Sequence, residues 1–451
     1  MNNLLFFILL FSFVVIYVFI GKKASSKTNH IDDYFLGDRK IGILSLTLTL
    51  LATQLGGGAL LGAADEAYLK GWSVIFYPIG MSLGLIALSL GFGRKLKNMG
   101  LSTVAEIFEK VYKSKKLRQI VSLISIVTLF FILSAQGIAA RKFFLSIGFD
   151  HAFVFLGFWV LVIFYTVIGG LKGVINTDIV KTIFILGTLI FVFIVAKNAT
   201  IPLNISGSGS IITKGNIPWV GWLLMPMLFM VIEQDMGQRC FAAKNAKTVT
   251  VSGIIASVVL FFCCSFAIYF GVLAKKFGME IGEKGVLMTS VFYMTGPTVS
   301  TIFSVAVLMV VVSTADSLLC SIASNIAFDF SKLKNVSSKN KLIISKVITL
   351  VVGVLAMLCS YLFDNVLPLL IKSYEFSVSI LFVPIAMSIF LKRASFKSCV
   401  LSMSLGAFGF VIFRIWPISF PKEIITLLLS FIGFFIPMII SEKEEILETG
   451  K

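Results

Sequence analysis

Residues 44–68, LSLTLTLLATQLGGGALLGAADEAY, have the length and apolar character of a membrane span, with Gly56, Gly57 and Gly58 near the centre. Glycine costs about 1 kcal/mol per residue in a helix interior relative to alanine, so three in a row predict an interrupted helix. Inside a bilayer, non-helical backbone is stable only where it faces protein or a water-filled cavity. The stretch is therefore a candidate binding site whose free carbonyl groups could hold a cation. The alternative is a kink, or close helix packing through small residues.

The composition of the chain is that of a membrane protein. Of its 451 residues, 58% are hydrophobic and 14% are charged, whereas about 25% are charged in ordinary soluble domains. The apolar runs are long enough to cross a hydrocarbon core of about 30 Å, and we predict an all-α polytopic membrane protein with about thirteen transmembrane helices. Two of these helices are expected at 151–168 and 175–197. The six cysteines have no metal-ligand spacing, so neither a zinc site nor a disulfide framework is expected.

The net charge of +17 does not indicate a nucleic-acid partner, because the cations gather in the gaps between apolar runs. Alternate loops are rich in lysine and arginine, at 94–118, 239–247, 332–341 and 392–397, whereas the loop 199–216 has a single lysine. Because cytoplasmic loops carry the excess of cations, this distribution predicts an N-terminus outside and a C-terminus in the cytoplasm. The expected location is the plasma membrane, with the lipid bilayer as partner.

Hydroxyl and carboxyl groups interrupt an apolar helix at VVVSTADSLLCSIAS, residues 310–324. Ser313, Thr314, Asp316 and Ser317 offer oxygen ligands and one negative charge, the chemistry that suits a small hard cation such as Na⁺. Ionisable residues inside a span are candidate functional groups because they are costly to hold there unpaired. The alternative is that the hydroxyls bond back to carbonyl groups of their own helix.

A second acid, Asp178, lies in GGLKGVINTDIVKT near the start of a predicted span. It is a candidate functional group because an ionisable side chain is costly to hold unpaired inside a span. The alternative is an interfacial carboxylate paired with Lys172 or Lys181.

An acidic pair, Glu233 and Asp235, lies in FMVIEQDMGQRC, at the end of a span near 217–236 or at a break within it. The pair is a candidate binding group for a positively charged amine. The alternative is a charged helix end whose carboxylates pair with Arg239.

These motifs together resemble those of the sodium:solute symporter family, secondary transporters with the five-plus-five inverted-repeat fold of the LeuT type. The resemblance is carried by DYFLGDRKIG (33–42), ATQLGGG (52–58), GGLKGVINTD (169–178), QRCFAAKNA (238–246) and STADSLL (313–319).

The resemblance implies a single transmembrane transporter domain over residues 1–451, with discontinuous helices in its core. The first repeat would occupy 43–197 and the second 217–390. A peripheral first helix would lie at 2–20, and two peripheral helices would lie at 396–440.

The resemblance also implies sites for Na⁺ as the coupling ion. The family's sodium site would be formed by two hydroxyl groups and three backbone carbonyl groups, from Ser313, Thr314, Ala52, Leu55 and Val310. A possible second sodium site would use Asp178, Asp316 and Ser317, and an aspartate stands at 316 where some relatives have serine.

The family's central substrate site would be lined by residues of the two broken helices and of the helix near 119–146. These are Gln54, Gly56, Gly57, Gln136, Met227, Val231, Glu233 and Asp235. The stretch from Gln54 to Tyr68 is similar to the choline-transporting branch, but that branch has a tryptophan where this chain has Gln54. Since quaternary ammonium groups favour aromatic cages, this departure weakens choline as the substrate.

We therefore expect Na⁺-coupled symport of a small organic solute, an amino acid or another amine-bearing molecule, by alternating access. No obligate protein partner is expected. The alternatives are H⁺ coupling through Asp178 and Asp316, and a transporter-like membrane sensor. We expect no enzyme: HExxH and the nucleotide-binding GxxxxGK do not occur in the chain.

Overall fold

The structure is a computed structural model, and it describes residues 2–25, 31–149, 151–198, 217–281, 285–330, 338–391, 395–416 and 420–449. The loop 199–216 and the loop cations at 332–337 and 392–394 lie outside these residues. Almost every described residue is helical, which confirms the predicted all-α class. The longer helices up to the middle of the chain are α1 (Asn3–Ser25), α3 (Ile43–Gln54), α4 (Ala63–Lys70), α5 (Phe76–Ala87), α8 (Lys115–Ser146) and α9 (Ala152–Lys197). The later ones are α10 (Trp219–Ile232), α11 (Gln234–Ala242), α12 (Ala246–Lys276), α13 (Val286–Asp329), α14 (Ser338–Cys359), α15 (Val366–Phe390), α16 (Phe396–Ile415) and α17 (Lys422–Thr449).

Short helices join these elements on the side where the predicted cytoplasmic loops lie. They are α2 (Ile31–Leu36), α6 (Gly93–Met99) and α7 (Glu106–Lys110). A short parallel bridge joins Ile41, two residues before α3, to Ala243, the residue that follows α11.

Ten helical runs of the described chain are long and apolar enough to cross a membrane, and α3 and α10 are shorter apolar helices. The run 152–197 contains more than one crossing, because α9 reverses at Gly170 (φ 56°, ψ −167°). Tyr165 and Lys181 would lie about 24 Å apart in a straight helix, yet the Tyr165 hydroxyl accepts a hydrogen bond from Lys181 Nζ at 3.2 Å. The count of thirteen spans is not confirmed.

The predicted interruption of the first core helix is confirmed. Helix α3 ends at Gln54, Leu55 leaves the helical region (φ −75°, ψ 73°), and the chain resumes with a π-helical turn over Gly58–Gly62. The glycines also permit close packing: a Cβ on Gly57 would lie 2.3 Å from Cβ of Ala139. The interruption and the small-residue packing, weighed as alternatives in the sequence, thus occur together.

A second interruption separates α10 from α11. Glu233 has extended backbone angles (φ −68°, ψ 133°) and is the residue at which one helix ends and the other begins. The break predicted as one possibility within 217–236 is therefore present, and it places the acidic pair inside the protein rather than at a surface helix end.

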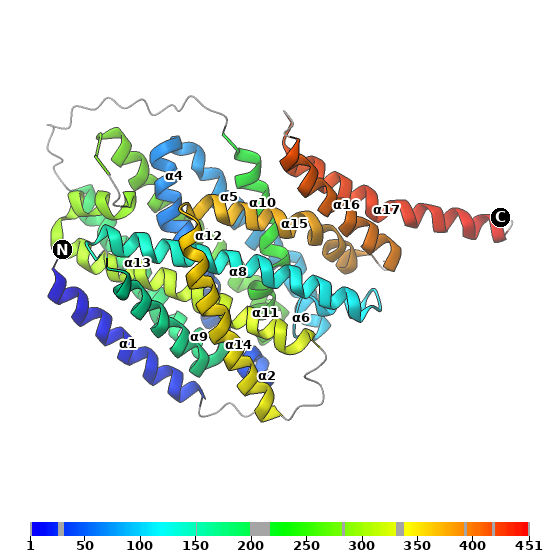
Figure 1. The fold of residues 1–451 in the computed structure, drawn as a ribbon, viewed down its shortest axis with the longest axis horizontal. Coiled ribbons are helices and arrows are strands. Elements are labelled where there is room, and N and C mark those ends of the chain that lie inside the picture. Colours follow the sequence, from blue (N-terminus) through cyan, green and yellow to red (C-terminus); the bar gives the residue numbers. More distant parts are fainter. Residues whose placement is uncertain are drawn as a thin grey trace.

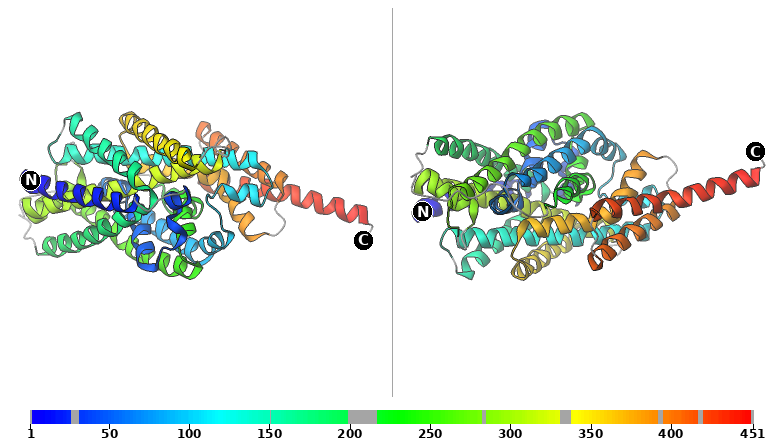
Figure 2. Two further views of the ribbon diagram at one scale, coloured as in Figure 1. Left: turned by 90° about the horizontal axis from the view of Figure 1, so that it is seen from below. Right: turned by 90° about the horizontal axis from the view of Figure 1, so that it is seen from above.

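Helix α13 packs against α8, α9 and α12, whereas α1, α16 and α17 lie at the edges of the molecule (Figure 1). In its most apolar stretch, 94% of the residues of α13 are buried, compared with 17% for α1 and 28% for α17. The views from above and below show the two chain ends at opposite ends of the long axis (Figure 2). The repeat boundaries at 43–197 and 217–390 stay a prediction.

Candidate functional site

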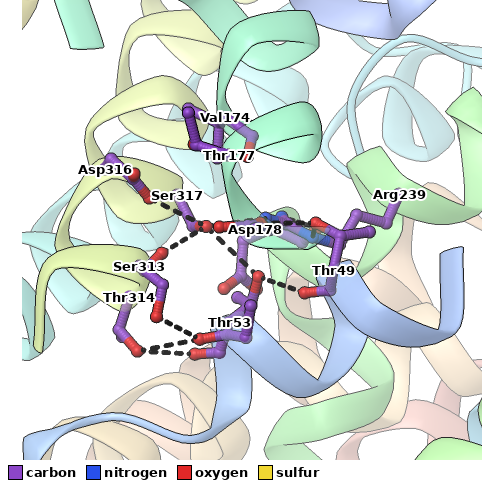
Figure 3. A network of polar contacts seen from close by, with 12 residues as sticks. Thr49, Thr53, Val174, Thr177, Asp178, Arg239, Ser313, Thr314, Asp316 and Ser317 are labelled. Atoms are coloured by element: carbon purple, nitrogen blue, oxygen red, sulfur yellow. Dashed lines mark hydrogen bonds and ion pairs between the residues drawn. The ribbon is translucent and has the colours of Figure 1, made fainter. Parts of the chain in front are cut away.

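The first candidate site lies where the broken end of α3 meets the middle of α13 (Figure 3). The Ser313 hydroxyl lies 2.9 Å from the Ala52 carbonyl oxygen and 3.0 Å from that of Val310. The Thr314 hydroxyl lies 3.4 Å from the Ala52 carbonyl oxygen. Four of the five residues predicted for a sodium site therefore converge. Their oxygens carry no formal charge, and the side chains are buried.

The remaining predicted ligand, Leu55, lies at the break itself. Its N–H still donates to the Leu51 carbonyl at 2.8 Å, but its own angles are non-helical, so its carbonyl leaves the direction of the α3 axis. The structure adds one oxygen that the sequence did not single out. The carbonyl of Thr53 accepts a hydrogen bond from the Thr314 hydroxyl at 2.9 Å.

A cluster of charged side chains lies next to this site, around Asp178 of α9 and Asp316 of α13. Lys181 Nζ lies 2.5 Å from Asp316 Oδ2 and 3.6 Å from Asp178 Oδ1. The Tyr165 hydroxyl also donates to Asp316. The Thr49 hydroxyl donates to Asp178 Oδ2 at 2.6 Å. Both aspartate side chains are completely buried. Charged and hydrogen-bond partners offset this burial, except that Asp178 Oδ1 accepts no hydrogen bond from the described residues and has only the Lys181 charge nearby.

Arg239 of α11 completes the charged cluster. Its Nη2 lies 3.6 Å from Asp178 Oδ2 and donates to the Ser317 hydroxyl at 2.6 Å. The sequence offered Arg239 as a partner of the acidic pair Glu233 and Asp235. In the structure, the guanidinium group of Arg239 instead pairs with the Asp178 carboxylate. At Asp235, Arg239 Nη1 donates to the backbone carbonyl at 3.1 Å and not to the carboxylate.

The pairing of Asp178 with Lys181, weighed as an alternative in the sequence, is present. The three-residue spacing on one helix was its signal. The roles of Tyr165 and Arg239 had no local signal, because their partners lie far along the chain.

The second candidate site is a small cavity between the two broken helices, α8 and α15. Its volume is about 20 Å³, about the space needed for one water molecule. The predicted substrate residues that line it are Gln54, Gly56, Gln136, Glu233 and Asp235. Lining residues that the sequence did not single out include Tyr77, Ile132, Leu370 and Tyr374, and Thr314 of the predicted sodium site also reaches the cavity.

Hydrogen bonds hold the polar lining in place. Gln136 Oε1 accepts from the N–H of Gly57 at 2.8 Å, so the freed backbone at the break is satisfied by a side chain of α8. Gln54 Nε2 donates to Glu233 Oε2 at 3.2 Å, which joins the two helix breaks directly.

Three predicted substrate residues do not line this cavity: Gly57, whose N–H donates to Gln136, and Met227 and Val231. Met227 and Val231 lie on α10, and Met227 packs against α5, where its carbonyl oxygen is 2.5 Å from the position that a Cβ on Gly84 would take. The break at Glu233, beyond these residues, turns the acidic pair rather than this face of α10 toward the cavity.

Aromatic rings supply part of the lining. Tyr374 stacks on Phe229 with ring centroids 4.5 Å apart, and Tyr77 lines the same cavity from α5. Both tyrosines lie in helices whose sequences predict ordinary spans. Their arrangement depends on how α5 and α15 pack, so no local pattern indicated it.

Residues 34–406 match the family model described as the sodium:solute symporter family. The human high affinity choline transporter 1 is 24% identical over 430 residues, which cover 86% of this chain and 72% of that protein. The sodium/proline symporter of Escherichia coli (strain K12) is 26% identical over 375 residues, which cover 75% of this chain and 73% of that protein.

Among solved structures, a substrate-bound, outward-open state of a Na⁺-coupled sialic acid symporter is similar with a TM-score of 0.78 at 19% identity. The likeness covers 96% of this chain and 97% of that one. It confirms the predicted transporter fold.

Proposed function

The chain belongs to the sodium:solute symporter family, as its motifs predicted, and we propose that it takes up a small organic solute together with Na⁺ across the plasma membrane. The matching family and the relatives named above are transporters, so the expectation that the chain is not an enzyme is confirmed. Na⁺ is cargo in this proposal, moved down its gradient while the solute accumulates.

One observation carries the sodium assignment: two hydroxyls of α13 point at carbonyls freed by the break in α3. Ser313 and Thr314 approach the Ala52 carbonyl oxygen at 2.9 Å and 3.4 Å. Hydroxyl and carbonyl oxygens are the ligands that hard cations accept. The proposed site is formed by these three residues with the carbonyls of Val310 and Leu55.

The lining of the small cavity supports an amine-bearing solute. Glu233 and Asp235 supply carboxyl groups, and Tyr77 and Tyr374 supply aromatic rings. Carboxylates and ring faces both attract ammonium groups. Two of the relatives are named for choline and for proline. Choline has a quaternary ammonium group and proline has a secondary amine, so these two compounds should be tested first. Because the cavity holds about one water molecule, it must widen to admit either, as alternating access requires.

We propose an N-terminus outside and a C-terminus in the cytoplasm. Arg118, in a cation-rich segment, lies 2.7 Å from Asp329 at the end of α13, and this end would face the cytoplasm. The N–H of Asn2 donates to Thr301 at 3.0 Å. About 42 Å of helix separates Thr301 from Asp329. This length exceeds the thickness of the hydrocarbon core, which supports an N-terminus on the side of the membrane opposite to Asp329.

The proposal is tested by uptake of labelled choline and proline into proteoliposomes that contain the purified full chain. An inward Na⁺ gradient is imposed, and K⁺ replaces Na⁺ in the control. We expect accumulation of at least one compound with Na⁺ and none with K⁺. Glu233→Gln should weaken uptake of a cationic solute, whereas Glu280→Gln, at an exposed position, should leave uptake unchanged.

Three results would contradict the proposal in different ways. Equal accumulation with K⁺ would reject sodium coupling. Uptake that follows a pH gradient without Na⁺ would favour the H⁺ alternative. Saturable binding of a solute without accumulation would favour the sensor alternative.

A further inference from the structure

We propose that the ammonium group of Lys181 takes the place of a second coupling sodium ion, so that the chain binds a single Na⁺, at Ser313 and Thr314. The inference rests on the proposed function, and it concerns the charged cluster formed by Asp178, Asp316, Lys181 and Arg239.

Lys181 Nζ occupies the position that a second sodium ion would need. It lies 2.5 Å from Asp316 Oδ2, 3.2 Å from the Tyr165 hydroxyl and 3.6 Å from Asp178 Oδ1. An ammonium group is a compact point charge with three donors, and here it has three oxygen neighbours. Two of them belong to the carboxylates that would have held the ion.

The third side chain of the possible second site is engaged by the other cation. The Ser317 hydroxyl accepts a hydrogen bond from Arg239 Nη2 at 2.6 Å and donates to the Ser313 carbonyl at 2.7 Å. Arg239 also donates through Nε to the Thr49 hydroxyl at 3.1 Å. Every side chain that could bind a second sodium ion therefore contacts a cation of the protein itself.

The charges of the cluster balance. Two aspartates face one lysine and one arginine, and all four side chains are completely buried. A sodium ion added here would leave one unpaired positive charge away from water, where charge carries a large desolvation penalty. Removing the Lys181 charge would reverse this balance, because the two aspartates would then face Arg239 alone. A small mobile cation would be attracted into the space that the ammonium group had filled.

An aromatic ring also stabilises a fixed cation at this position. Lys181 Nζ lies 5.2 Å from the ring centroid of Tyr17, whereas at Tyr165 it contacts the hydroxyl group. Ring faces attract cations at such a distance. Lys181, unlike a bound ion, cannot leave for either side of the membrane, so it contributes no charge movement from one solution to the other.

The test is a count of bound sodium by equilibrium binding of ²²Na⁺ to the purified full chain in lipid nanodiscs, which requires no solute. We expect one ion per wild-type chain and two per Lys181→Gln chain. The double variant Lys181→Gln with Asp316→Asn restores charge balance and should bind one ion again. Lys172→Gln is the matched control, because Lys172 lies on the same helix but pairs with Asp38 near the surface, and it should bind one.

The outcomes separate this inference from the proposed function. Two ions in the wild type would overturn the inference and leave sodium coupling intact. One ion in both the wild type and Lys181→Gln would also overturn it, since Lys181 would then be purely structural. No bound ion in the wild type would overturn the proposed sodium site and the inference with it. If Lys181→Gln does not fold, the double variant Ser313→Ala with Thr314→Ala provides the test. This variant should bind no sodium ion, and a sodium ion that still binds would contradict the inference.

Discussion

Two polar regions lie next to each other on α13, and they differ in the charge and the partners of their oxygen atoms. At Ser313 and Thr314 the oxygens are uncharged hydroxyls and carbonyls. At Asp316 the oxygens are charged and already paired with Lys181 and neighbouring donors. The first region can accept a cation with little rearrangement of charge, whereas the second already contains its cations.

Carboxylates in a transporter core therefore do not by themselves mark an ion site. A buried carboxylate needs a positively charged or hydrogen-bonding partner in every state of the protein. Here the partner of Asp316 is Lys181, a side chain of the same protein that cannot dissociate. Neutral oxygens can exchange protein hydrogen bonds for an ion, and can return to those bonds when the ion leaves.

The largest expected effect is loss of sodium stimulation in Ser313→Ala with Thr314→Ala. Removing both hydroxyls deletes two proposed ligands while leaving an apolar, correctly sized helix face. Uptake in proteoliposomes should no longer depend on Na⁺, while the protein still inserts. The control is Ser290→Ala with Thr295→Ala, whose hydroxyls donate to carbonyls of their own helix. Unchanged Na⁺ dependence in the first double variant would remove the site assignment.

The next effect is a loss of stability in Asp316→Asn. The substitution leaves Lys181 with a diminished partner in a completely buried position, which costs about 3–5 kcal/mol when one member of a buried ion pair is removed. Ser313→Ala removes only neutral hydrogen bonds and should cost about 1 kcal/mol. Thermal unfolding in detergent should therefore rank Asp316→Asn well below Ser313→Ala. Equal unfolding temperatures would mean that the pair with Lys181 is not formed.

A smaller effect is expected when the first helix break is filled. In Gly57→Ala, the added methyl would lie 2.3 Å from Cβ of Ala139, and such overpacking costs about 1–3 kcal/mol. Uptake and thermal stability should both fall. Gly187→Ala is the control, because no atom lies within 4 Å of its added Cβ. Full uptake by Gly57→Ala would show that the backbone at the first helix break can move away from α8 without loss of transport.

The smallest effect is expected at the surface pair of α9. Lys172 lies 2.9 Å from Asp38, with both side chains partly exposed, and such pairs contribute about 0–1 kcal/mol. Lys172→Gln should therefore leave the unfolding temperature nearly unchanged, in contrast to any single change in the buried cluster. A large drop in the unfolding temperature of Lys172→Gln would show that burial does not explain the difference in stability between the surface pair and the buried pairs.

Much of the fold could be predicted because a bilayer restricts backbone structure. Long apolar runs must be helical there, and the glycines at 56–58 indicated the break that the structure contains. The hydroxyls at 313 and 314 were recognised because they interrupt an apolar helix. The pairing of Asp178 with Lys181 was visible as a three-residue spacing.

Other contacts could not be predicted because they join distant parts of the chain. Arg239 and Ser317 are separated by 78 positions, and Tyr374 and Tyr77 reach one cavity from α15 and α5. Residue spacing carries information only about neighbours on the same helix, so Arg239 was assigned to the nearest acids in the sequence rather than the nearest in space.

The sequence by itself determined the membrane class, the symporter family, the two helix breaks as candidates and the hydroxyl pair, because composition and local spacing are read directly from the chain. Only the tertiary structure decided which cation neutralises which carboxylate and which side chains surround the cavity. The physical reason is that a buried charge is stabilised by whichever opposite charge packing brings within a few ångströms, and packing brings together helices that lie far apart along the chain.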